Sequence, residues 1–126
     1  MNLLDKVVQL EEDASQFGFE WETTDQIMAQ IESECDEINE HLSQGVDGAG
    51  QKELQEEIGD LLHAVFSLCV FCKLNPRDTL EQTLIKFERR LNAVKAIAQE
   101  RGLTSLRGYP FDELMDVWQK AKKRAG

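Results

Sequence analysis

The chain has 126 residues, with 14 Lys and Arg against 24 Asp and Glu, which gives a formal net charge of −10. A chain of this length can bury roughly two-thirds of the surface that its unfolded form exposes, so we expect residues 1–126 to form a single domain. The negative charge argues against nucleic acid polymers and anionic membranes as partners, because both are polyanions that would repel it.

Two further features bear on where the protein works. The longest nearly apolar stretch, Leu61 to Cys72, is much shorter than the ~20 residues that span a bilayer. The N-terminal segment turns acidic where a secretory signal would be apolar. Three cysteines, Cys35, Cys69 and Cys72, lie at apolar helical positions, which suits packing in a reducing compartment. We therefore expect a cytoplasmic protein without a membrane partner.

The spacing of apolar residues predicts helices throughout, because no stretch alternates like a strand for more than a few residues. A first helix is expected from Leu3 to Gln16, and an aromatic connector from Phe17 to Trp21 follows it. A second helix opens with a capping box formed by Thr23 and Gln26. The glycine-containing stretch from Ser43 to Gly50 should end this helix.

Three more helices complete the prediction. The third runs from Gln51 to Lys73, and its second half is apolar nearly all round, as in a helix enclosed by neighbours. Asn75 can cap a fourth helix from Pro76 to Arg101, and Gly102 suits a left-handed turn at its end. The last helix spans Pro110 to Arg124, with acidic residues in its first turn and basic residues in its last. The predicted fold is all-α, of four-helix-bundle type, with the bundle completed by oligomerisation.

Two pairs of carboxylates stand out on the second and third predicted helices. Glu34 and Glu37 lie three residues apart, as do Glu57 and Asp60, so each pair occupies one helix face. If the two helices are antiparallel, the four side chains can converge on a common point. A hard divalent cation such as Mg²⁺ or Mn²⁺ would relieve their repulsion. Either pair alone also fits a solvated helix face, but Asp60 enters an apolar run, where an acid needs a partner.

Two basic residues on the fourth predicted helix could complete the site. Lys86 and Arg90 are one turn apart at the flank of the apolar stripe, and they could present two cations to a polyphosphate. The same run of residues also fits an ordinary exposed helix face.

At these positions the sequence resembles the MazG-like nucleoside triphosphate pyrophosphohydrolases, part of the all-α pyrophosphatase superfamily. The EExxE and ExxD motifs of that family are similar to residues 33–37 (SECDE) and 57–60 (EIGD), and its KFERR segment to residues 86–90. Ser33 stands where the family has the first Glu of EExxE. The resemblance extends from about Phe17 to Arg124.

The resemblance implies a chemistry and a set of site residues. It implies that the four carboxylates bind Mg²⁺, with Mn²⁺ able to substitute, and that Lys86 and Arg90 hold the triphosphate. The implied reaction cleaves the bond between the α and β phosphates of a nucleoside triphosphate and gives a monophosphate and pyrophosphate. It also implies a homodimer or homotetramer. We expect deoxynucleoside triphosphates as substrates and a role in cleaning the nucleotide pool.

Several residues have more than one interpretation. Phe17, Phe19 and Trp21 could stack on a nucleobase, as aromatic residues before the first motif of the family do, or could pack the first helix onto the bundle. Packing is the favoured interpretation, although Trp21 is retained as a candidate substrate-binding residue. The Cys-x-x-Cys spacing of Cys69 and Cys72 lacks the second pair of a structural zinc site, and is assigned to packing.

Two other classes of protein stay open as alternatives. His63 follows Asp60 at the spacing of the Glu-x-x-His element of di-iron bundles, which need that element twice, and only His41 remains for the second. A non-catalytic acidic helical interaction module is the other alternative. Such a module has no reason to direct four carboxylates towards one another, whereas a Mg²⁺ enzyme does.

Overall fold

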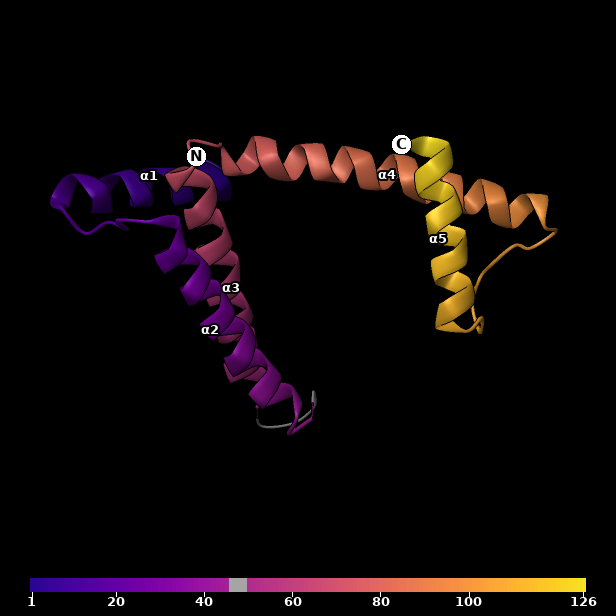
Figure 1. Ribbon diagram of the computed structural model, residues 1–126, viewed down its shortest axis with the longest axis horizontal. Coiled ribbons are helices and arrows are strands. Elements are labelled where there is room, and N and C mark those ends of the chain that lie inside the picture. The colour runs from indigo at the N-terminus through magenta and orange to yellow at the C-terminus, as the bar shows by residue number, and fades with distance from the viewer. Residues whose placement is uncertain (46–49) are drawn as a thin grey trace. The chain divides into compact units, whose positions relative to one another are not determined.

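The computed structural model describes residues 1–45 and 50–126, and this part of the chain contains helices and no strand (Figure 1). The helices, in chain order, are α1 (Leu3–Phe17), α2 (Thr24–Leu42), α3 (Gln51–Phe71), α4 (Pro76–Glu100) and α5 (Phe111–Ala125). The all-α prediction is confirmed, and the predicted boundaries agree with these to within two residues. Of the stretch predicted to end the second helix, residues 46–49 lie outside the described residues.

Local side-chain bonds explain where the helices begin and end. Thr23 and Gln26 form the predicted capping box of α2, in which each side chain accepts a hydrogen bond from the other residue's backbone N–H. At the start of α4, Asn75 Oδ1 accepts from the backbone N–H of Asp78 at 3.1 Å. These caps satisfy donors that the first helical turn leaves unpaired. Gly102 adopts the predicted left-handed conformation, with φ of 76°, just after α4.

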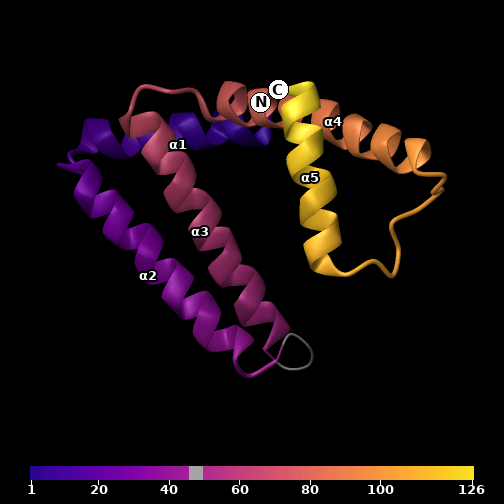
Figure 2. The same ribbon diagram turned by 45° about the vertical axis from the view of Figure 1, so that its right-hand side comes forward.

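The described residues form two compact units, Met1–Thr79 and Leu80–Gly126, and each is considered by itself. In the first unit α2 and α3 lie side by side and antiparallel, and α1 packs against α3 (Figure 1 and Figure 2). Ile27, Leu54 and Ala64 are the buried apolar side chains of these helices. The antiparallel α2–α3 pair is the frame that carries the candidate site. A single domain over residues 1–126 stays a prediction.

A small apolar core holds the second unit together. Ala93 and Ile97 of α4 pack with Val117 and Ala121 of α5, and each of these side chains is less than a tenth exposed. Leu106, from the segment that connects the two helices, packs against them. Burial of these apolar groups is the main term that stabilises this unit.

Several apolar side chains that the sequence predicts to be enclosed are exposed. Leu62 on α3 and Leu84 on α4 are 53% and 55% exposed. Within the described part of one chain, α1 and α2 cover only part of the circumference of α3, so enclosure of its second half depends on a further copy of the chain and stays a prediction. Phe17 and Phe19 are 90% and 82% exposed, so their favoured interpretation as core residues is wrong.

The three cysteines differ in burial. Cys69 is half-buried, while Cys35 and Cys72 are exposed, so the packing interpretation fits only Cys69. All three are free thiols. No helix within residues 1–45 and 50–126 is long and apolar enough to cross a bilayer.

Candidate active site

The four predicted carboxylates lie on the helix pair that packs face to face, with Glu34 and Glu37 on α2 and Glu57 and Asp60 on α3. The pKa of Glu37 is raised above its ordinary value, first by the charge of Glu34 and then by partial desolvation. The charges of Glu57 and Asp60 raise it further, across the interface between the two helices. The charges of the other three acids therefore act together on Glu37, which favours a proton or a cation beside it.

Glu34 is the acid that the fold buries, because it is only 7% exposed. Its Oε1 accepts a hydrogen bond of 2.7 Å from Nε2 of Gln30, one turn earlier on α2. Its Oε2 is buried without a hydrogen-bond partner among the residues that the structure describes. A buried carboxylate oxygen without a partner is unfavourable, so this atom is suited to a ligand that brings positive charge.

Glu57 presents a second oxygen of the same kind from α3. Its Oε2 is also buried and has no hydrogen-bond partner in the described part of the chain. Nδ1 of His41 lies 2.7 Å from this oxygen, which is the distance of an ion pair, but the contact lacks hydrogen-bond geometry. His41 therefore adds positive charge beside Glu57 when it is protonated, and it leaves the acceptor capacity of the carboxylate open.

Asp60 differs from its prediction, because its side chain is exposed rather than held in an apolar environment. Asp60 lines the same cavity as Glu34 and stays open to solvent there, so entering the apolar run does not bury the acid. Across residues 1–45 and 50–126, no three His, Cys, Asp or Glu side chains are arranged as a finished metal cluster. The donor set still fits a hard divalent cation, since carboxylate oxygens are its preferred ligands and two buried ones accept no hydrogen bond.

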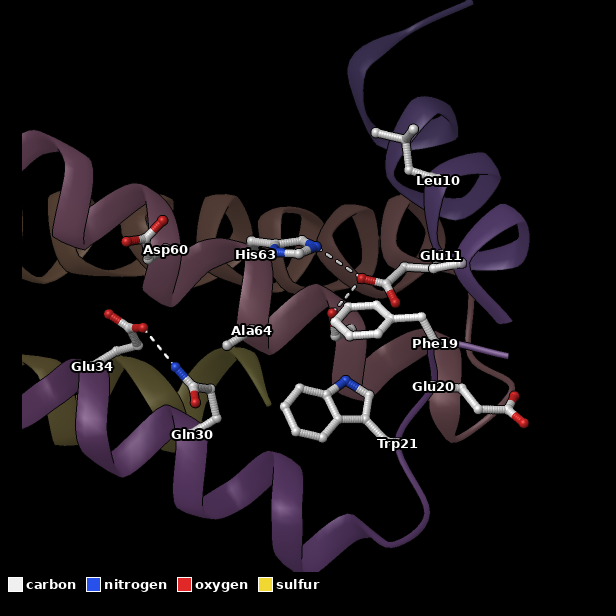
Figure 3. A pocket seen from close by; sticks show the side chains of 12 residues that line it. Leu10, Glu11, Phe19, Glu20, Trp21, Gln30, Glu34, Asp60, His63 and Ala64 are labelled. Atoms are coloured by element: carbon white, nitrogen blue, oxygen red, sulfur yellow. Dashed lines mark hydrogen bonds and ion pairs between the residues drawn. The ribbon is translucent and has the colours of Figure 1, made fainter. Parts of the chain in front are cut away.

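A cavity of about 530 Å³ lies in the first unit beside these acids. Glu34 and Asp60 line one end of it, and Phe19 and Trp21, from the aromatic connector, line the other (Figure 3). Volumes of this size are typical of small-molecule sites. The cavity joins the carboxylates to an aromatic surface, which supports Trp21 as a candidate substrate contact.

The two predicted phosphate-binding cations belong to the second unit. Lys86 is exposed on α4. Arg90 is half-buried, donates from Nε to the carbonyl oxygen of Gly126 at 3.1 Å, and lies with its guanidinium 5.9 Å from the ring centre of Trp118. The structure thus gives Arg90 partners of its own within that unit, and a part for both cations in the site stays a prediction.

Sequence reasoning missed two residues beside the site and considered a third only for a di-iron site. Gln30 bonds Glu34 and Glu11 on α1 lines the cavity, while His41 contacts Glu57. Helical spacing could have indicated Gln30, which lies four residues before Glu34 on the same face. No pattern in the sequence links Glu11 to α3, because the pairing depends on how α1 packs.

Comparisons with known proteins bear on the same segment. Residues 22–95 match the family model of the MazG nucleotide pyrophosphohydrolase domain. A Thermotoga maritima protein named nucleoside triphosphate pyrophosphohydrolase/pyrophosphatase MazG is 32% identical over 90% of this chain and 42% of its own length. The nucleoside triphosphate pyrophosphohydrolase of Escherichia coli is 33% identical over 85% of this chain and 40% of its own length.

The chain therefore spans about two-fifths of the length of these relatives. The family match contains the carboxylates of α2 and α3 and also Lys86 and Arg90. The match covers more than half of the chain, so the chain belongs to the MazG nucleotide pyrophosphohydrolase domain family.

Proposed function

We propose that this chain is a divalent-metal-dependent enzyme that hydrolyses nucleoside triphosphates to nucleoside monophosphates and pyrophosphate. The observation that carries the proposal is that Glu34 on α2 and Glu57 on α3 each bury a carboxylate oxygen that accepts no hydrogen bond, within a MazG-family domain. In the reaction, one water adds to the triphosphate and the bond between its α and β phosphates breaks. We propose deoxynucleoside triphosphates as the substrates.

The residues of α2 and α3 would hold the metal. Glu34, Glu37, Glu57 and Asp60 are the proposed ligands, for Mg²⁺ or for Mn²⁺ in its place. When bound, the ion neutralises the triphosphate and makes water a stronger nucleophile. Gln30 fixes the rotamer of Glu34 through its hydrogen bond to Oε1, so that Oε2 keeps its direction. No side-chain nucleophile is required by this chemistry.

Other residues would bind the rest of the nucleotide. Lys86 and Arg90, one turn apart on α4, are proposed to neutralise the phosphates. Trp21 is proposed to contact the nucleobase, because its ring lines the cavity that contains Glu34 and Asp60. Binding energy from such remote contacts positions the reacting phosphate at the metal.

We propose that the active form is a homodimer or a homotetramer. Large apolar side chains are exposed on α3 and α4, with Leu62, Val65 and Phe87 at 53%, 40% and 49%. Surfaces of this kind are typical of interfaces between protein chains, and a second copy would remove these side chains from water. Light scattering after gel filtration tests this: a monomer at micromolar concentration would contradict it. A cytoplasmic role in cleaning the nucleotide pool belongs to the same proposal.

The experiment that tests the function is pyrophosphate release from a panel of ribonucleoside and deoxynucleoside triphosphates, with Mg²⁺ and with EDTA. Chromatography should identify the monophosphate as the nucleotide product, and deoxynucleotides should react faster. Glu57→Gln and Asp60→Asn should abolish release, while Glu53→Gln, at an exposed acid in the first turn of α3, should keep it.

Two outcomes would favour another class of protein. Absence of release from every triphosphate, together with no effect of Mg²⁺ on the melting temperature, would favour a non-catalytic interaction module. Visible absorption from bound iron would favour a di-iron protein, for which His63 and His41 are the available histidines. In the structure these histidines contact Glu11 and Glu57, respectively.

A further inference from the structure

Glu11 forms a polar network at the end of the cavity that lies away from Glu34. It comes from α1, and its side chain is only 17% exposed. Its Oε1 accepts hydrogen bonds from the hydroxyl of Ser67 and from Nε2 of His63, the latter at 2.8 Å. Ser67 is itself only 3% exposed, so the hydrogen bond that it donates to Glu11 lies in the packed interior of the first unit.

This network leaves one oxygen of Glu11 for a ligand. His63 and Ser67 both bond Oε1, and no residue in segments 1–45 and 50–126 forms a hydrogen bond with Oε2. Figure 3 shows the carboxylate beside the ring of Phe19, with Trp21 close by on the same side of the cavity. Two bonds to one oxygen hold the carboxylate in a single orientation, so Oε2 is a fixed acceptor.

The aromatic surface beside Glu11 is suited to a nucleobase. Phe19 is 82% exposed, so most of its ring is not covered by the chain, and Trp21 lines the same cavity. Protein aromatic rings commonly stack on bases and leave the base edges for hydrogen bonds. At the other end Glu34 and Asp60 line the cavity. The same cavity therefore contains both the proposed metal ligands and Glu11.

We propose that Glu11 determines the base preference by accepting a hydrogen bond from the exocyclic amino group of the base. A carboxylate only accepts, so it pairs with the amino group of cytosine, adenine or guanine. At position 4, uracil and thymine present a carbonyl oxygen where cytosine presents the amino group, so an acceptor fixed opposite position 4 attracts cytosine and repels the other two. Their ring N3–H lies one atom further along the edge, outside that contact. Nucleotides whose base carries an amino group are thus the favoured substrates. This inference rests on the proposed function, because it assigns a base to the same site.

The test compares CMP with UMP, which differ at position 4 of the base. Their affinities are measured by isothermal titration calorimetry with Mg²⁺ present, so that no turnover is needed. The wild-type protein should bind CMP about tenfold or more tightly than UMP, since bonds to charged groups carry that much free energy. In Glu11→Gln the amide can also donate to the uracil carbonyl, and the ratio should fall to within about threefold. Glu12→Gln, at the exposed neighbouring acid, should keep the wild-type ratio.

Two further variants change the residues that hold the Glu11 carboxylate in place. Ser67→Ala and His63→Gln keep the carboxylate but remove its fixed orientation, so the ratio should fall part of the way while both proteins stay folded by circular dichroism. These variants also test the proposal if Glu11→Gln does not fold.

Equal affinity for the two monophosphates in the wild-type protein would overturn the inference, and so would an unchanged ratio in Glu11→Gln. Failure of the inference differs from failure of the proposed function. Pyrophosphate release from CTP and UTP at equal efficiency leaves the proposed function intact and removes the role of Glu11. Preferential binding of CMP without pyrophosphate release from any triphosphate supports the role of Glu11 and contradicts the proposed function.

Discussion

Replacing Glu34 with Gln should change stability in opposite directions with and without a divalent cation. In the metal-free protein, the buried and unpartnered Oε2 of Glu34 costs on the order of 1–3 kcal/mol. The amide of Gln removes a charge from the cluster and can donate a hydrogen bond to the nearby Glu37. Glu34→Gln should therefore melt at a higher temperature than the wild-type protein in EDTA. For a chain of this size, each kcal/mol corresponds to roughly 3–5 °C.

Excess Mg²⁺ should reverse this order. A ligand present at a hundredfold excess over its dissociation constant stabilises the folded state by about 2.7 kcal/mol. The wild-type protein should gain this stabilisation, and Glu34→Gln should gain little of it, because it lacks one proposed ligand. The wild-type protein would then melt above the variant, although it melts below the variant in EDTA.

Thermal unfolding followed by circular dichroism at helical wavelengths measures this effect. Glu32→Gln is the matched control, because Glu32 is an exposed acid on the same helix, and it should behave like the wild-type protein in both buffers. A variant that melts below the wild-type protein in EDTA would refute the reasoning about the unpartnered oxygen. A difference between the two melting temperatures that is the same in Mg²⁺ as in EDTA would refute Glu34 as a metal ligand.

Four other substitutions give further tests. The pKa of Glu37 is raised in the folded protein, so its stabilising contribution is present below its ordinary value of 4.5 and is lost as the pH rises through the raised pKa. In EDTA, the melting temperature of Glu37→Gln relative to the wild type should therefore increase from acid to neutral pH, and a difference independent of pH would contradict this. In the second unit, Ile97→Ala should cost ~2–5 kcal/mol in urea unfolding, because Ile97 is 4% exposed in the core. Arg124→Ala, which removes the exposed ion pair with Glu100, should cost much less and less still in high salt. Trp21→Ala should raise KM by about tenfold with little change in kcat, as expected for loss of base stacking, and an unchanged KM would exclude Trp21 from the site.

Features encoded by neighbouring residues could be predicted from the sequence. The capping box of Thr23 and Gln26, the cap by Asn75 and the turn at Gly102 depend only on residues a few positions apart, and all of them are present. The carboxylate pairs were identifiable for the same reason, since spacing on a helix fixes the face that they share. The way in which α2 packs on α3 then brings the two faces together.

Features that depend on packing could not be predicted in the same way. The sequence placed Asp60 in an apolar environment, but its side chain is exposed, and Glu34 is the buried acid instead. Glu11 lies 52 residues before His63, and no periodicity connects them. The exposure of Phe19 likewise depends on which helices surround the connector.

The central claim is that the carboxylates of α2 and α3 hold the divalent cation on which hydrolysis depends. The most direct test titrates Mg²⁺ into metal-free protein by calorimetry and measures pyrophosphate release from one triphosphate at the same Mg²⁺ concentrations. The account predicts that release rises with occupancy of the metal site, and that Glu57→Gln weakens binding and release together while Glu53→Gln changes neither. Release that persists in EDTA, or Mg²⁺ binding that is unchanged in Glu57→Gln, would contradict it.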